Sequence, residues 1–194
     1  MAKIKLNAAS GGGSVSLQAP SSSSNDRVYT LPDSADITTL AGILMCDQWY
    51  LTAHKTDNTT ISANLLRNDR TGAASQIGTG MSQSSGIFTF PRTGKYLVIF
   101  NGQFALNGST NIVVLTQVTT NNGASFQNHA RALDGNNGSG ERSGSGASFA
   151  FIDVTDTSQV KVRFNIQVIG TNDQISGSTS FQTTTFTFIR IGDT

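Results

Sequence analysis

Strict alternation of apolar and polar residues over positions 160–168 is the feature that most restricts the fold of this chain. The apolar members of this segment all fall on one side: Val160, Val162, Phe164, Ile166 and Val168. The residues between them are polar: Lys161, Arg163, Asn165 and Gln167. A period of two is the geometry of an extended strand with one buried face. The segment therefore predicts a half-buried antiparallel β-strand.

Further segments of the same kind predict an all-β domain. Strands are expected at 46–54, 61–67, 87–90, 96–106, 112–119, 125–133, 147–154 and 181–191. Asn-Gly pairs at Asn107, Asn122 and Asn137 fall between expected strands, where such pairs favour tight hairpin turns. The pair at Asn101 falls inside a strand and indicates a β-bulge. About nine strands reversed by Gly and Asn predict a β-sandwich or jelly roll.

Charge and cysteine content exclude several classes of partner and site. Thirteen Lys and Arg stand against twelve Asp and Glu, so the net charge of +1 offers no excess for neutralising phosphates, and nucleic acid is not expected as a partner. The single cysteine, Cys46, excludes an intrachain disulfide and a thiolate zinc site. No apolar run is long enough to span a bilayer, so membrane insertion is not expected.

The first 42 residues differ in composition from the rest of the chain. They hold a Gly/Ser tract at 10–14, a Ser run at 21–24 and two of the three prolines. Such a segment buries too little apolar surface to offset its ordering entropy. The sequence therefore predicts an extended arm over 1–42, with one helical turn near 33–42, and a folded head over 43–194. Short alternating pieces of the arm can each add a strand to a neighbouring sheet edge, through Ile4, Leu6, Val15, Leu17, Tyr29 and Leu31.

Residues suited to catalysis are scarce. His54 and His129 are far apart in the sequence, and the one glutamate, Glu141, lies in a Gly-rich segment that gives a carboxyl group no fixed surroundings. The tripeptide Gly94-Lys95-Tyr96 lacks the preceding Gly and the following Ser or Thr of a phosphate-binding loop. The chain is therefore expected not to be an enzyme and to need no cofactor.

Two polar segments, 134–146 and 170–173, suggest a ligand site. Oxygen donors suit Ca²⁺, and the calcium candidates are Asp134, Asn136 and Asp173. The same loops can contact a glycan through Arg131 and Arg142, with Trp49 and Tyr50 as aromatic platforms. The competing interpretations are an exposed loop without a ligand, and packing of both aromatic residues in the core or at an interface.

The strand expected at 96–106 is apolar on both faces where it begins. Tyr96, Val98 and Phe100 share one face, whereas Leu97 and Ile99 lie on the other. A strand that is apolar on both faces needs a cover on both faces. This pattern predicts a partner surface at Leu97 and Ile99.

The head resembles C1q/TNF-like domains. The resemblance is carried by Ser85-Gly86-Ile87-Phe88-Thr89-Phe90-Pro91-Arg92-Thr93-Gly94-Lys95-Tyr96 and by the final strand Phe186-Thr187-Phe188-Ile189-Arg190-Ile191, with an Asp-containing turn at 154–159 before the late strand 160–168. It covers about residues 43–194. The resemblance implies a jelly-roll sandwich of about ten antiparallel strands that assembles into a homotrimer. The candidates for the trimer interface are Leu97, Ile99, Trp49 and Tyr50.

The arm is similar to attachment segments of structural and fibre-like proteins of tailed phages, particularly those of marine cyanobacteria. The similarity rests on residues 4–20 and on Tyr29-Thr30-Leu31-Pro32-Asp33. It implies a location on a virion, where the arm binds a capsid or tail protein. The expected function is that of a capsid-decoration or short fibre protein. One alternative is a tail-associated host-recognition module that binds surface polysaccharide; another is a cytokine-like ligand, which suits the head and not the arm.

Overall fold

The computed structural model describes residues 3–7, 14–18, 43–72, 76–107, 111–135 and 140–194. Contacts within the chain divide it into two units, residues 1–40 and 41–194. All regular elements of the described residues are β-strands. Accordingly, these residues include no helix of the length and apolarity needed to cross a membrane.

The first unit contains one antiparallel hairpin. Strand β1 (Lys3–Asn7) pairs with β2 (Ser14–Gln18), so that Ile4 lies opposite Leu17 and Leu6 opposite Val15. Two of the pieces that the sequence assigned to a neighbouring sheet edge therefore pair with each other here. The expected contacts of Tyr29 and Leu31 and the helical turn at 33–42 lie outside the described residues.

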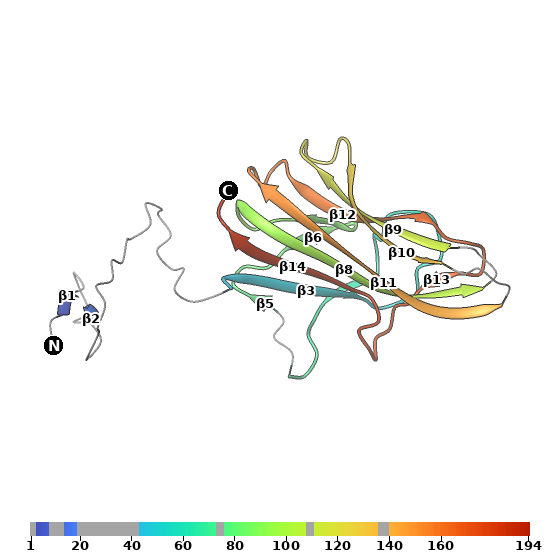
Figure 1. Ribbon diagram of the computed structural model, residues 1–194, viewed down its shortest axis with the longest axis horizontal. Coiled ribbons are helices and arrows are strands. Elements are labelled where there is room, and N and C mark those ends of the chain that lie inside the picture. The colour runs from blue at the N-terminus through green and yellow to red at the C-terminus, as the bar shows by residue number, and fades with distance from the viewer. Residues whose placement is uncertain (1–2, 8–13, 19–42, 73–75, 108–110, 136–139) are drawn as a thin grey trace, which may run out of the picture. The chain divides into compact units, whose positions relative to one another are not determined.

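The second unit is a sandwich of two antiparallel sheets (Figure 1), as the sequence predicted. The first sheet runs in the order β11 (Glu141–Val154), β8 (Gly94–Asn107), β14 (Thr185–Gly192), β3 (Met45–Leu51) and β4 (Leu65–Arg67). Two short strands complete its seven: β13 (Gln174–Ile175) pairs with β8, and β5 (Gln76–Ile77) pairs with β3. The five-stranded sheet runs in the order β10 (Gln127–Gly135), β9 (Asn111–Thr119), β12 (Lys161–Val168), β7 (Ile87–Thr89) and β6 (Ser82–Ser84).

Aromatic side chains from both sheets fill the space between them. Phe88 and Phe164 come from the five-stranded sheet and lie 6.0 Å apart between ring centroids. Phe186 lies 4.7 Å from Phe164, and Phe188 lies 4.9 Å from Phe88. All four rings are buried. Each contributes roughly 1.5–3 kcal/mol from the removal of apolar surface from water, before entropy costs.

One local prediction is confirmed and one is wrong. Asn122 and Gly123 both have positive φ, 57° and 92°, as expected for the tight turn between β9 and β10. No bulge occurs at Asn101, because β8 pairs with β11 in continuous register through Asn101 and Gly102. Glycine is needed at position 102 for space, since a Cβ there would lie 2.6 Å from the ring of Phe100.

The strand directions set which connections share an end of the sandwich. Strand β3 begins and β14 ends at the same end, because the two are antiparallel neighbours (Figure 1). Strand β8 runs antiparallel to β14, and β11 runs antiparallel to β8. The turns before β8 and after β11 therefore lie at this end as well, together with the turn after β9. The connections that leave β8, β10 and β12 lie at the opposite end, together with the segment 52–64 that follows β3.

Candidate interaction surface on the seven-stranded sheet

The outward face of the seven-stranded sheet, which we term the open face, carries a continuous apolar row. Alternation along β8 buries Tyr96, Val98 and Phe100 in the core and turns Leu97 and Ile99 outward. The register then aligns one outward side chain from each of five neighbouring strands, in the order Phe151, Leu97, Ile189, Cys46 and Ile77. Such a row crosses the full width of the sheet.

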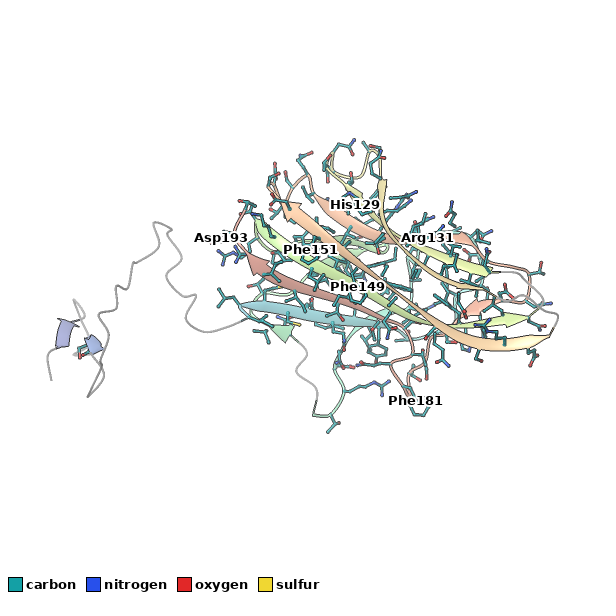
Figure 2. All side chains as sticks on the ribbon, viewed as in Figure 1. His129, Arg131, Phe149, Phe151, Phe181 and Asp193 are labelled. Atoms are coloured by element: carbon teal, nitrogen blue, oxygen red, sulfur yellow. The ribbon has the colours of Figure 1, made fainter. Side chains whose placement is uncertain are left out.

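A second row runs beside the first. Phe149 lies opposite Ile99, and Ile99 lies opposite Thr187. Thr187 in turn faces Gln48, whose side-chain Nε2 donates to its Oγ1 at 3.1 Å. The two phenylalanines are the most exposed part of this surface, with Phe149 62% and Phe151 71% accessible (Figure 2). Two adjacent, largely exposed aromatic rings are the expected signature of a protein contact.

The other half of the open face is polar. Beyond Ile99 the outward residues of β8 are Asn101, Gln103, Ala105 and Asn107. Near the far end of the strand a pocket of about 430 Å³ is lined mostly by polar residues from β8, β11 and the segment around β13, including Asn107, Glu141, Ser143 and Gln174. The apolar surface is therefore confined to the half of the face where β8 begins.

Trp49 and Tyr50 were expected at the interface, but Trp49 faces the core, and Tyr50, on the outward side of β3, is covered by Arg70. Trp49 points into the sandwich, where its ring meets Phe88 edge-on at 5.6 Å between centroids. Tyr50 is 3% exposed, and the guanidinium of Arg70 lies 5.2 Å from its ring centroid. Packing therefore occupies both aromatic residues and leaves neither as a platform for a glycan. Leu97 and Ile99 lie on the open face.

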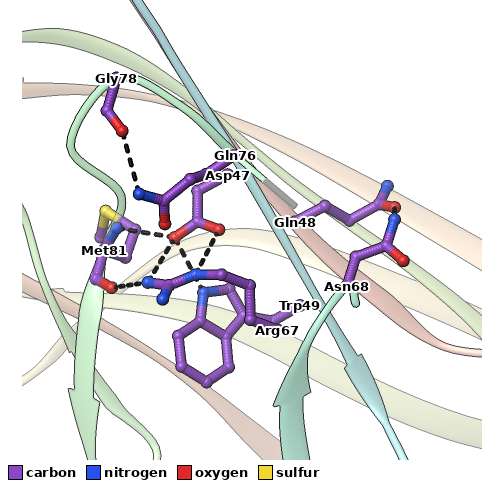
Figure 3. A network of polar contacts seen from close by, with 8 residues as sticks. All are labelled: Asp47, Gln48, Trp49, Arg67, Asn68, Gln76, Gly78 and Met81. Carbon is purple, nitrogen blue, oxygen red and sulfur yellow. Dashed lines mark hydrogen bonds and ion pairs between the residues drawn. The ribbon is translucent and has the colours of Figure 1, made fainter. Parts of the chain in front are cut away.

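A buried carboxylate organises the edge of the sheet beside the open face (Figure 3). Asp47 is 1% exposed and accepts hydrogen bonds from Arg67 Nε at 3.0 Å, from Trp49 Nε1 at 3.0 Å and from the backbone N–H of Met81 at 2.7 Å. Arg67 also donates to the Met81 carbonyl and lies 4.7 Å from the Trp49 ring centroid. These contacts tie β3 to β4 and to the segment before β6.

The single cysteine lies within the apolar row. Cys46 is half-buried on the open face, between Ile189 and Ile77. Burial, and secondarily the negative charge of the neighbouring Asp47, raise the pKa of its thiol above the ordinary value. This residue is therefore a slow-reacting internal probe of whether the open face is covered.

The calcium candidates are engaged in contacts of their own. Asp173 accepts hydrogen bonds from the backbone N–H groups of Asn107 at 2.6 Å and Gly170 at 3.0 Å. Asp134 accepts from Arg142 Nη2 at 3.0 Å. Asn136 lies outside the described residues, and the described part of the chain holds no group of three His, Cys, Asp or Glu side chains placed to bind a metal. Calcium binding stays a prediction.

The remaining candidates lie in different places. Arg142 bridges the two sheets, because it also donates to the Gly135 carbonyl of β10. Arg131 is exposed on the outward face of β10. His54 accepts from the Gly177 N–H at 3.2 Å, whereas His129 is exposed at the bulge of β10, so the histidines belong to different parts of the sandwich. Among these residues no nucleophile lies beside an activating base.

Comparison with known proteins identifies the fold. No family model and no curated protein matches the chain. Among solved structures it is similar to Eiger TNF from S. frugiperda, with a TM-score of 0.61 and 9% identity over 78% of this chain and 94% of that one. It is also similar to murine APRIL, with a TM-score of 0.56 and 12% identity over 76% of this chain and 98% of that one. The head is therefore a TNF/C1q-like jelly roll.

Proposed function

We propose that this chain is a non-enzymatic phage structural protein whose head forms a homotrimer through the open face and whose residues 1–42 attach it to the virion. The observation that carries the trimer is the apolar row from Phe151 to Ile77. A five-residue row that begins at the exposed Phe151, with the exposed Phe149 in the row beside it, is too large and too continuous for scattered surface apolar residues.

The asymmetry of the open face favours a closed ring of copies. Its most exposed residues, Phe149 and Phe151, lie on the edge strand β11, whereas Leu97, Ile189 and Cys46 form a flatter area over the middle of the sheet. A projecting edge that fits a flat face of the next copy is a heterologous contact, and such contacts form a ring when the rotation between copies closes. Each phenylalanine buried in this way contributes roughly 1.5–3 kcal/mol, set against the entropy of association.

Attachment to a virion is supported by the sequence of the first unit. Residues 4–20 and 29–33 resemble phage attachment segments, and β1 and β2 show that part of this unit takes up extended structure. Three heads in one assembly would bring three such segments to the particle, so that individually weak contacts act together.

The trimer is tested with two matched variants of the full chain. We expect Phe151→Asp to convert the protein from trimer to monomer at micromolar concentration, because it places a charge in the apolar row. Phe181→Asp is the control, since Phe181 has the same 71% exposure and lies on a loop outside that row. Sedimentation equilibrium gives the mass of each. A wild-type monomer, or equal loss of assembly in both variants, would contradict the trimer.

The location is tested on purified particles. Labelling virions with an antibody against the head, followed by electron microscopy, should place gold at regular positions on the capsid or the tail. The same label on particles from a deletion of this gene is the control. Particles that carry no specific label would refute the virion role and leave the trimer result unaffected.

A further inference from the structure

The outward face of the five-stranded sheet, here termed the cationic face, differs in charge from the rest of the head. Its edge strand β10 turns Arg131 outward, and β12, two strands further into the sheet, turns Lys161 and Arg163 outward. The register opposes Arg131 to Leu115, Arg163 to Gln117 and Lys161 to Thr119. The three cations are therefore spread over neighbouring rows of one sheet.

No carboxylate shares this face among the described residues. The outward positions that surround the cations are neutral: Ser82, Ser84, Ile87, Thr89, Val113, Leu115, Gln117, Thr119, Asn128, Leu133, Asn165 and Val168. Asp134 of β10 points inward and is 7% exposed. Asp156, in the turn before β12, accepts hydrogen bonds within that turn from Ser158 N and Oγ.

The net charge of the whole chain does not reveal that positive side chains gather on this one face. The formal charge is +1, yet most exposed acidic residues of the described head belong to other regions: Asp57, Asp69, Glu141, Asp153 and Asp193. Asp156 is also exposed and lies in the turn before β12, outside the strands of this face. A face that bears only positive charge produces a local positive potential even on a nearly neutral protein. Such a local potential attracts anionic ligands.

Hydrogen-bonding groups lie between the cations and are held in place. The Arg163 guanidinium lies 3.8 Å from the ring centroid of Phe126, and its Nε donates to Gln117 Oε1 at 2.8 Å. Gln117 Nε2 then donates to Asn128 Oδ1 at 2.8 Å. Because these contacts fix Arg163 before a ligand arrives, less rotamer entropy is lost on binding. Amide groups in such a row suit the hydroxyl groups of sugars.

From this arrangement we infer that the cationic face binds an anionic polysaccharide. The charged groups lie on strands β10 and β12, which are separated by two strand spacings, about 10 Å. Cations this far apart on an open sheet match repeated charges along an extended chain better than a single small anion. The side-chain amides of Gln117 and Asn128, which lie between the two strands' cations, match a polymer that carries sugar hydroxyls between its charges.

The inference extends the proposed function and does not depend on it. The cationic face belongs to the five-stranded sheet, whereas the proposed trimer contact belongs to the seven-stranded sheet. Trimerisation through the open face would leave the cationic face accessible and would place three copies on one assembly, which raises the apparent affinity for a repeating polymer.

The test uses the full chain and immobilised heparin as a sulfated polysaccharide probe, with a neutral dextran matrix as the blank. We expect retention on heparin at low ionic strength, elution by salt and no retention on dextran. Arg131→Gln and Lys161→Gln should each weaken binding by about threefold, and the double variant by about tenfold. Lys55→Gln is the control for the loss of a positive charge outside this face, where Lys55 is paired with Asp57, and it should change binding by less than about twofold.

Three results would overturn the inference: no retention of the wild type at low salt, equal weakening by Lys55→Gln, or tighter binding to duplex DNA than to heparin. Circular dichroism of each variant confirms that the fold is intact. Phe151→Asp separates the two proposals, since it leaves the cationic face unchanged. A monomeric variant that still binds heparin supports polysaccharide binding by the cationic face. A trimeric protein that fails to bind heparin refutes that inference and leaves the proposed trimer standing.

Discussion

Asp47 shows how a single buried residue holds one edge of the sandwich together. Its carboxylate receives hydrogen bonds from two side chains and one backbone N–H, and the residue is almost fully inaccessible. A buried charge is tolerated only when its partners compensate for lost hydration. Arg67, the compensating cation, remains partly open to solvent, with 34% of its side chain exposed.

We therefore expect Asp47→Ala to destabilise the head by roughly 2–4 kcal/mol, because it leaves the Met81 N–H and Trp49 Nε1 without their acceptor. This loss of stability is smaller than that expected on breaking a fully buried ion pair, because water can reach Arg67 once Asp47 is gone. Urea unfolding followed by Trp49 fluorescence measures the change.

The control for this measurement is Asp57→Ala. Asp57 pairs with Lys55 at 2.5 Å, and 60% of its side chain is exposed. Exposed pairs contribute at most about 1 kcal/mol, so the control should lose correspondingly little stability. Equal effects of the two substitutions would show that the Asp47 network is not a stabilising element.

Cys46 allows a measurement that depends on pH. The raised pKa of its thiol reduces the thiolate fraction at any pH below that value, and the thiolate is the reactive form. We expect iodoacetamide to alkylate Cys46 more slowly than a cysteine peptide at pH 8. Because the pKa of Cys46 is raised, its alkylation rate should continue to rise with pH above the ordinary thiol value of about 8.5.

Phe151→Asp should accelerate alkylation of Cys46 by uncovering the open face. Equal rates in the wild type and this variant would place Cys46 outside the interface.

At the scale of elements, the loop between β13 and β14 illustrates a backbone constraint. A Cβ on Gly177 would lie 2.2 Å from the Ala53 carbonyl oxygen, and the next residue, Ser178, donates its N–H to the Leu51 carbonyl at 2.9 Å. The obstructing atoms are backbone atoms of the segment after β3, so they cannot turn aside as a side chain would. The loop is thus packed closely against that segment.

We expect Gly177→Ala to cost about 1–3 kcal/mol of stability, as overpacking does elsewhere. Gly192→Ala is the matched substitution, because nothing lies within 4 Å of its Cβ position, and it should stay within about 0.5 kcal/mol of the wild type. Thermal unfolding by circular dichroism compares the two. Equal melting temperatures would show that the loop adjusts without cost.

Alternation of apolar and polar residues correctly predicted the strands whose apolar side chains point into the core. In β12 the inward residues Val162, Phe164 and Ile166 are all apolar, and the structure buries each of them. In β11 the pattern is inverted, because small residues such as Ala150 point inward while Phe149 and Phe151 point outward. The strand itself was predictable, but which of its two faces points to solvent was not. The exposed phenylalanines were therefore missed.

Trp49 was misplaced for a related reason. Its neighbours Gln48 and Tyr50 face outward, yet Tyr50 is covered by Arg70, so neither polarity nor size marks the inward position. The bulge expected at Asn101 failed because Gly102 serves close packing against Phe100, a long-range contact that a local pattern does not record. Local patterns thus predicted most elements of the fold, whereas the side-chain surroundings depend on contacts between distant segments.

For the whole molecule, the two units predict a separation of tasks. We expect a chain that lacks residues 1–42 to keep a folded, trimeric head, because the apolar core and the open face lie entirely within residues 43–194. The same chain should fail to join particles. Sedimentation tests the first expectation, and the occupancy of purified virions tests the second. Truncated protein at full occupancy would show that the head itself attaches.

The shared end at which β3 begins and β14 finishes has a practical consequence for engineering. A tag fused after Thr194 emerges beside the start of β3, at the end of the sandwich where the chain of residues 1–42 joins the head. Cargo intended for presentation belongs at the opposite pole, in the connection between β12 and β13. The sandwich thus has an inherent polarity that vaccine or sensor designs can exploit.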